Sequence, residues 1–141
     1  MKYESFSSEA TVEIASNLAK KAKAGDIFCL NGDLGAGKTQ FAKGFAQGLG
    51  IKEDITSPTF TIVHEYSGGR LHLYHFDVYR INSFDEMFDI GFDEMLFGDG
   101  ICVIEWAEKI KDIIPQEAVF ISIERGESEN HRVIRIDSKC H

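Results

Sequence analysis

One eight-residue stretch, Gly32 to Thr39, constrains the fold of this chain more than any other. It reads GDLGAGKT and matches the phosphate-binding loop pattern G-x-x-x-x-G-K-[ST]. A short apolar run at residues 26–30 precedes it and predicts a buried strand, and residues 40–49 follow with apolar side chains at helical spacing. This order places backbone N–H groups at a helix N-terminus, where they bind phosphate oxygens. The stretch therefore predicts binding of a nucleoside triphosphate.

The residues of this loop have separate tasks in such a site. Glycines let the backbone approach the phosphates closely. We expect Lys38 to reach the β- and γ-phosphates and the Thr39 hydroxyl to ligate Mg²⁺. The chain has no Asn-Lys-x-Asp tetrapeptide, the motif by which GTPases usually recognise guanine. Its absence favours ATP as the nucleotide. The predicted nucleotide contacts from the loop are Gly32, Asp33, Leu34, Gly35, Ala36, Gly37, Lys38 and Thr39.

Length, charge and cysteine usage limit the remaining possibilities. The 141 residues fit a single domain, residues 1–141, and a formal net charge of −8 disfavours a broad nucleic-acid surface, which needs clustered Lys and Arg. No apolar run could span a membrane and the N-terminus lacks a signal-peptide core, so we expect a cytoplasmic protein.

Cys29 and Cys102 fall in predicted buried strands and Cys140 in the tail, without metal-ligand spacing, which favours buried thiols without a chemical role.

The rest of the chain alternates between helix and strand patterns. We expect, in order, a helix that begins after Ser7-Ser8 and ends at Gly25, a hairpin of residues 59–66 and 71–77, a helix from about Phe84 capped by Asn82 or Ser83, a buried parallel strand at 101–104, a short helix at 107–114, and a hairpin of residues 119–124 and 132–136. Together they predict an α/β protein: a single-domain P-loop NTPase fold with a mixed, partly parallel sheet flanked by helices and β-hairpins.

A phosphate loop needs a second acid on the Mg²⁺ side, usually at the end of a neighbouring strand. Glu105 follows the apolar run 101–104, the context of a buried strand that ends in a carboxylate. Asp77 follows a mixed, half-exposed strand. We therefore predict Glu105 as the metal-side acid, bound to the metal directly or through water. We predict Asp77 near the γ-phosphate, where it either positions water or supports the groups that touch the phosphate. The alternatives are a surface acid at the strand end for Glu105 and a turn cap for Asp77.

Two further features lie near these motifs. Residues 56–59, TSPT, join the predicted loop helix to the first hairpin, where P-loop proteins often carry a switch segment that senses the γ-phosphate. Ser and Thr before Pro also make ordinary turns, so switch and plain loop both stay open. Trp106, next to Glu105, is either a core aromatic or a docking one.

Four segments in this order resemble one family. They are GDLGAGKT at 32–39, TSPTF at 56–60, HFDVYR at 75–80 and IEWAE at 104–108. They are similar to the bacterial TsaE (formerly YjeE) family, the ATPase component of tRNA threonylcarbamoyladenosine synthesis. The resemblance extends from the N-terminal helix to about Pro115.

This resemblance implies a small ATPase that works with two partner proteins, TsaB and TsaD. Those partners transfer the threonylcarbamoyl group to tRNA, and the ATPase resets their complex, so the chain meets tRNA only through the complex. The site roles that the resemblance implies are phosphate binding by Lys38 and the loop amides, Mg²⁺ binding by Thr39 and Glu105, a switch at Thr56 to Thr59, support of hydrolysis by Asp77, and a place for Trp106 in the site and its docking surface.

Two other functions use the same loop. A small-molecule kinase needs a lid with basic residues, and the only large insert, residues 81–100, contains no Lys or Arg. A nucleotide-gated interaction module needs binding without turnover, and the acidic, aromatic stretch 84–97 is then its partner surface, although the same stretch also fits a solvated amphipathic helix. No arginine lies in the phosphate loop and the nearest motif-borne one is Arg80, so we expect slow hydrolysis unless a partner supplies a cation.

Overall fold

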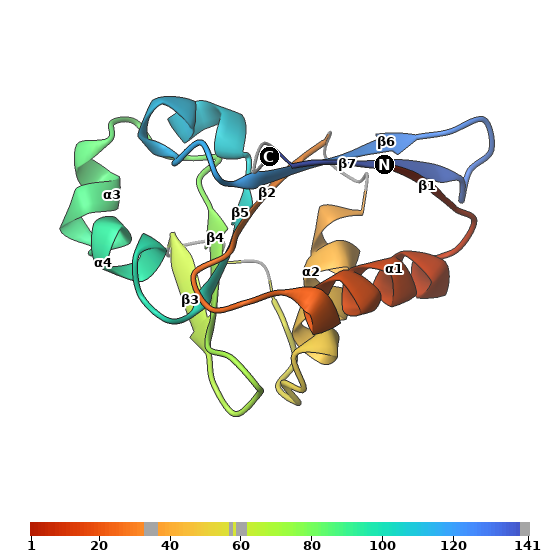
Figure 1. Cartoon of the computed structure of the whole chain (residues 1–141). Helices are drawn as coiled ribbons and strands as arrows, with labels where there is room; N and C mark the ends of the chain where they lie inside the picture. Colours follow the sequence, from red (N-terminus) through yellow and green to blue (C-terminus); the bar gives the residue numbers. More distant parts are fainter. Residues whose placement is uncertain (33–36, 57, 59–61, 139–141) are drawn as a thin grey trace.

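The computed structural model describes residues 1–32, 37–56, 58 and 62–138, and Figure 1 shows how its elements are arranged. The elements are β1 (Lys2–Ser5), α1 (Ser8–Lys21), β2 (Ile27–Asn31), α2 (Lys38–Gly48), β3 (Val63–Tyr66), β4 (Leu73–Asp77), α3 (Asp85–Asp89), α4 (Phe92–Leu96), β5 (Ile101–Glu105), the 3₁₀ helix η1 (Ala107–Ile113), β6 (Val119–Arg125) and β7 (Arg132–Ser138).

Seven strands form one mixed sheet in the order β1-β7-β6-β2-β5-β4-β3. The four central strands β6, β2, β5 and β4 run parallel, whereas β3, β7 and β1 join antiparallel at the two sides. The carboxyl ends of the parallel strands therefore meet at one edge of the sheet. This arrangement confirms the predicted P-loop fold, including the mixed sheet and both hairpins.

Apolar side chains cover both faces of the sheet, as a parallel centre requires. On β2, Phe28 and Leu30 belong to the core beneath α1 and α2, whereas Ile27 and Cys29 belong to a second core beneath α3, α4 and η1. The two groups of helices lie on opposite sides of the sheet in Figure 1. The sheet thus separates two apolar cores, and the edge where the parallel strands end lies between these cores.

Several predicted elements differ from the observed ones. The single helix expected from Phe84 is two short helices, α3 and α4, because Gly91 between them takes a left-handed φ of 82°. Neither Asn82 nor Ser83 caps α3 with its side chain. Instead, the Glu86 carboxylate accepts hydrogen bonds from the backbone N–H groups of both residues, at 2.6 and 3.1 Å.

Other differences concern the ends of elements. The helix expected at 107–114 is a 3₁₀ helix that ends at Ile113, and the first hairpin strand begins at Val63, since Ile62 lies outside it. The expected start of that strand at 59–61 lies outside the described residues. Strand β4, expected to be half-exposed, buries Leu73, His75 and Phe76 because it pairs with β5 in the interior of the sheet. In the part of the chain that the structure describes, no helix is long and apolar enough to cross a membrane.

Candidate functional site

The described residues on both sides of the predicted phosphate loop lie at the carboxyl edge of the sheet. Strand β2 ends at Asn31 and α2 begins at Lys38, with Gly37 as its N-cap. Gly37 has a φ of 108°, which a side chain would strain, so this position needs glycine. The start of α2 therefore meets the end of β2, as a phosphate site requires. Asp33, Leu34, Gly35 and Ala36 lie outside the described residues.

Lys38 points back toward the strand edge and is only 5% exposed. Its ammonium group donates a hydrogen bond of 2.7 Å to the carbonyl of Gly32 and lies 3.4 Å from the ring centroid of Trp106. A carbonyl dipole and an aromatic face compensate a buried cation without neutralising it. The charge is thus held beside the phosphate loop, where a polyanion would attract it. Thr39, the predicted Mg²⁺ ligand, is half-buried in the first turn of the same helix.

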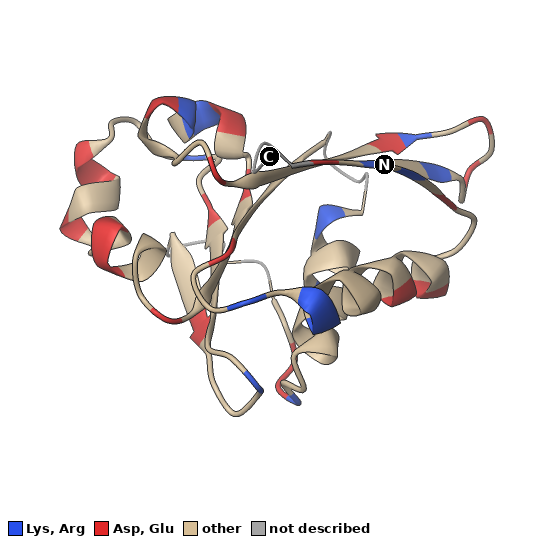
Figure 2. Cartoon of the chain, in the orientation of Figure 1, with Lys and Arg blue, Asp and Glu red and all other residues tan. Residues whose placement is uncertain are grey.

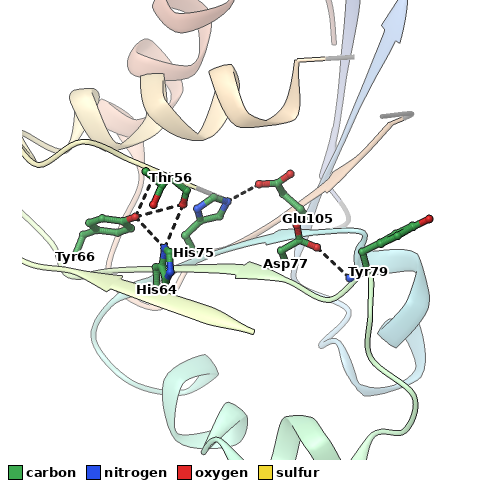
Figure 3. A network of polar contacts seen from close by, with 7 residues as sticks. All are labelled: Thr56, His64, Tyr66, His75, Asp77, Tyr79 and Glu105. Carbon is green, nitrogen blue, oxygen red and sulfur yellow. Dashed lines mark hydrogen bonds and ion pairs between the residues drawn. The ribbon is translucent and has the colours of Figure 1, made fainter. Parts of the chain in front are cut away.

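Glu105 ends β5 and is 3% exposed, which excludes the alternative of a surface acid. Its Oε2 lies 2.5 Å from Nε2 of His75 on β4, a pair that is buried on both sides (Figure 3). The backbone N–H of the next residue, Trp106, donates to the carbonyl of Leu30 on β2, at 3.2 Å. The carboxylate is therefore fixed at the strand edge by a buried donor and by the neighbouring backbone.

Asp77 ends β4 directly beside Glu105, because the two are register partners on adjacent parallel strands. Register partners point to the same face of a sheet, and Figure 3 shows both side chains at the same edge. Oδ1 of Asp77 also accepts a hydrogen bond of 3.0 Å from the backbone N–H of Tyr79. This bond caps the turn after β4, which is the alternative role that the sequence left open for Asp77. Asp77 therefore shapes the turn after β4 and still lies at the predicted site.

Trp106 has the only positive φ among the non-glycine described residues, 63°. The turn places its ring against Tyr79, at 4.7 Å between centroids, and over the Lys38 ammonium. A left-handed conformation costs an L residue about 1–2 kcal/mol, so the surrounding contacts hold it in place. The half-buried Trp106 ring therefore lies between Tyr79 and the Lys38 ammonium group.

The segment that carries the predicted switch is described only in part. Ser57 and Thr59 lie outside the described residues, whereas Thr56 is exposed and its backbone is tied to β3. The Thr56 carbonyl lies 3.2 Å from Nδ1 of His64, and its N–H donates to the Tyr66 hydroxyl at 3.3 Å (Figure 3). One end of the segment is therefore anchored to the strand next to β4.

These groups suit a magnesium–phosphate complex better than a metal held by protein alone. Among the described residues, no group of three or more His, Cys, Asp and Glu could enclose a metal ion. Mg²⁺ commonly takes one or two carboxylates, waters and the phosphate oxygens of a nucleotide. Glu105, Asp77 and the Thr39 hydroxyl provide oxygen donors of that kind.

Sequence reasoning missed His75. The familiar His-x-x-x-His spacing belongs to helices, whereas His75 lies on strand β4. The alternation of side chains along a strand could have indicated His75. Residues two apart lie on the same face of a sheet, and His75 lies two residues before Asp77. In the described structure, Nδ1 of His75 is buried without a hydrogen-bond partner, so the imidazole bonds through Nε2 to Glu105 alone.

Comparison with known proteins agrees with this fold and site. The family model "Threonylcarbamoyl adenosine biosynthesis protein TsaE" matches residues 5–134. The tRNA threonylcarbamoyladenosine biosynthesis protein TsaE of Bacillus subtilis is 48% identical over 133 residues, which cover 94% of this chain and 83% of that protein. Its counterpart from Treponema pallidum is 46% identical over 123 residues, 87% of this chain and 90% of that protein. The crystal structure of YdiB from Bacillus subtilis superposes with a TM-score of 0.81 at 43% identity, and covers 98% of this chain and 84% of the other.

Proposed function

This chain belongs to the TsaE family of tRNA threonylcarbamoyladenosine biosynthesis proteins, and we propose that it serves that pathway as a magnesium-dependent ATPase. The observation that carries the proposal is the meeting of Lys38, Glu105 and Asp77 at the carboxyl edge of the sheet, beside the start of α2. A buried cation next to a phosphate loop and two strand-end carboxylates are the parts that phosphoryl transfer to water needs.

Each side chain has a proposed role in hydrolysis. Lys38 exchanges the Gly32 carbonyl and the Trp106 ring for β- and γ-phosphate oxygens. Thr39 and Glu105 would hold the metal ion, and His75 keeps the Glu105 carboxylate in place through its Nε2. Asp77 orients the attacking water. When bound, Mg²⁺ neutralises charge that develops on the phosphates.

We expect slow hydrolysis by the chain alone. The motif-borne Arg80 is exposed after β4 and lies outside the set of side chains described above. A cation supplied by a partner raises the rate of phosphoryl transfer by about 10³–10⁵ in other P-loop enzymes. The partners we propose are TsaB- and TsaD-type proteins, with ATP hydrolysis resetting their complex and tRNA meeting this chain only through it.

Two variants at the carboxylates separate binding from turnover. Glu105→Gln removes the charge from the metal side and is expected to weaken ATP binding in Mg²⁺ and to slow phosphate release. Asp77→Asn is expected to bind ATP normally and to slow phosphate release by about 100-fold, within the range for a positioned base. Glu94→Gln, an exposed acid on α4, is the control. Normal turnover in both site variants would contradict the proposed roles.

The fate of the γ-phosphate tests the kinase alternative. Residues 81–100 are packed against the sheet through Met87, Phe92 and Leu96 rather than standing free as a lid. Figure 2 shows acidic and no basic residues on α3 and α4. With γ-labelled ATP, we expect the label only in inorganic phosphate, and label on an added acceptor would favour a kinase.

A nucleotide-gated interaction module is the second candidate. The observation that favours it is the exposure of aromatic side chains around the acidic helices α3 and α4, with Phe88 45% and Phe97 74% exposed. Exposed aromatics of this kind often mark protein contacts. If Asp77→Asn binds ATP, does not hydrolyse it and still supports tRNA modification, gating by binding would replace hydrolysis as the function.

A further inference from the structure

Polar side chains follow one another across a single face of the sheet, from β3 to the carboxylates (Figure 3). His64 on β3 and His75 on β4 are register partners, so their side chains point to the same face. Tyr66, two residues after His64, belongs to the core beneath α1 and α2, which identifies that face. His75 contacts Glu105, and His64 contacts the backbone of Thr56. Thr56 is thus held one strand away from the residue that holds Glu105.

The Tyr66 hydroxyl is the centre of the contacts at Thr56. The tyrosine is 5% exposed, and its hydroxyl accepts a hydrogen bond of 3.3 Å from the Thr56 N–H and lies 3.5 Å from the Thr56 carbonyl oxygen. Nδ1 of His64 lies 3.2 Å from the same carbonyl oxygen and 3.3 Å from the hydroxyl. Both backbone polar groups of Thr56 therefore meet side chains from one strand.

One arrangement of protons satisfies all of these groups. With a proton on Nδ1, His64 donates to the Thr56 carbonyl, whose second lone pair accepts the Tyr66 O–H. The Tyr66 oxygen in turn accepts the Thr56 N–H. Without that proton, Nδ1 would face the carbonyl oxygen with one lone pair against another. The geometry thus favours the form of His64 that is protonated on Nδ1, in which three hydrogen bonds fix one residue.

The strand that carries Tyr66 and His64 is fixed at its other end. Arg70 lies between β3 and β4, and its guanidinium donates to the carbonyls of Ala19 and Ala22 at the end of α1, at 2.8 and 3.0 Å. Its backbone N–H donates to the carbonyl of Leu49 at the end of α2, at 2.6 Å. The β3–β4 hairpin is thus tied to both helices, so β3 gives Thr56 a rigid support.

We propose that Tyr66 and His64 are positioning residues for ATP hydrolysis, an inference that deepens the proposed ATPase function and rests on it. They fix the point at which the segment 56–59 begins, which reduces the conformational freedom that this segment loses when it meets the γ-phosphate. Lys38 and the phosphate loop supply the binding of ATP. Loss of the two positioning side chains therefore lowers kcat and leaves KM nearly unchanged.

Phosphate release from ATP by Tyr66→Phe tests the proposal. The substitution removes one hydroxyl and keeps the buried ring, so the fold should persist. We expect kcat to fall about tenfold and the KM for ATP to stay within about twofold of the wild-type value. Tyr74→Phe removes a hydroxyl from a half-buried tyrosine on the opposite face of β4, and this matched control should behave as the wild type does.

His64 gives an independent test by rescue. His64→Leu removes the donor to Thr56 and should also lower kcat about tenfold. His64→Asn places an amide N–H close to the position of the Nδ1 proton and should retain most of the turnover. Hydrogen exchange of the Thr56 amide measures the anchor directly, and it should be faster in Tyr66→Phe and unchanged in Tyr74→Phe.

Wild-type kcat in both Tyr66→Phe and His64→Leu would overturn the positioning role, and so would a loss confined to KM. Faster exchange at Thr56 with unchanged turnover would show an anchor that does not serve hydrolysis, which also overturns the proposal. Equal losses in His64→Leu and His64→Asn would remove His64 from it. If the wild-type protein released no phosphate at all, the proposed ATPase function itself would fail, a result distinct from the others.

Discussion

The contact between His75 and Glu105 is the most constrained polar feature of the described structure. Both side chains are buried and their atoms lie 2.5 Å apart, so the imidazole is the close polar partner of the buried Glu105 carboxyl group. Leaving a buried charge without its partner costs about 3–5 kcal/mol. The strand that carries His75 therefore helps to determine whether Glu105 can serve the metal.

We expect His75→Leu to lower both the free energy of unfolding and the affinity for ATP in Mg²⁺, since Glu105 would lose its donor. His75→Gln is the matched control, because a glutamine amide can reach the position of Nε2. Denaturant unfolding should show a loss of about 3 kcal/mol for leucine and substantially less for glutamine. Equal effects of the two substitutions would show that the imidazole contributes only packing.

The two described cysteines, Cys29 on β2 and Cys102 on β5, are buried as predicted. Burial raises the pKa of the Cys29 and Cys102 thiols from an ordinary 9.0 to about 12. At a pH between these two pKa values, both thiols are deprotonated in the unfolded chain and remain protonated in the folded chain. The unfolded state then binds fewer protons, so the stability of the fold must fall as the pH rises above 9.

The predicted size of this alkaline loss is up to about 1.4 kcal/mol per pH unit for each thiol. Unfolding in urea at pH 8, 9 and 10 measures it. Lysines and tyrosines also titrate in this range, so the comparison is with the double variant Cys29→Ala and Cys102→Ala. That variant should be less stable at pH 8 and should lose less stability between pH 9 and 10. Parallel pH profiles would contradict the assignment.

At the scale of elements, the packing of α1 against α2 depends on small residues. A Cβ built on Gly48 would lie 2.3 Å from the carbonyl oxygen of Ser16, and one on Gly44 would lie 2.3 Å from that of Val12. Both obstacles are backbone atoms, which cannot rotate away. The helices can therefore approach as closely as they do only with glycine at these positions.

Gly48→Ala is expected to destabilise the protein by about 1–3 kcal/mol, although alanine favours a helix more than glycine does. The steric cost of separating α1 from α2 exceeds the helix-propensity gain of about 1 kcal/mol. Gln47→Ala, an exposed neighbour on the same helix, is the control and should leave the melting temperature nearly unchanged. A Gly48→Ala variant more stable than the wild type would show that the helices can separate freely.

Local signals in the sequence were sufficient for most of the elements. The helix that follows the phosphate-loop motif, the apolar strands and the two hairpins were predictable, because each depends on a local periodicity or turn. Strand β1 was missed, because its residues Lys2–Ser5 become a strand only by pairing with β7 at the other end of the chain. The 3₁₀ form of η1 and the break at Gly91 likewise depend on packing against the sheet.

The site was predictable in part for the same reason. Glu105 and Asp77 could be placed because parallel strands end at a common edge, and the register confirms that they are neighbours. The partner of Glu105 could not be found without the strand order, since His75 lies 30 positions earlier in the chain. A cavity between the start of α1 and the turn after β6 brings residues 7–11 close to residues 130–132, a proximity that no local pattern indicates.

At the scale of the whole molecule, the proposed function is that of an ATPase that works through other proteins. The acidic chain, with its net charge of −8, exposes aromatic side chains in and next to α3 and α4. The described site has Lys38 but no arginine at the carboxylates. Such a site can bind a nucleotide and yet hydrolyse it slowly. Turnover by the chain alone should therefore be a small part of its turnover in the assembled pathway.

Phosphate release from ATP, measured for the wild type and Lys38→Ala, each alone and with a TsaB–TsaD pair, tests this claim most directly. The account predicts slow release by the wild type alone, an increase of at least about tenfold with the pair, and loss of both activities in Lys38→Ala. Equal wild-type rates with and without the pair, or persistent release in Lys38→Ala, would contradict it.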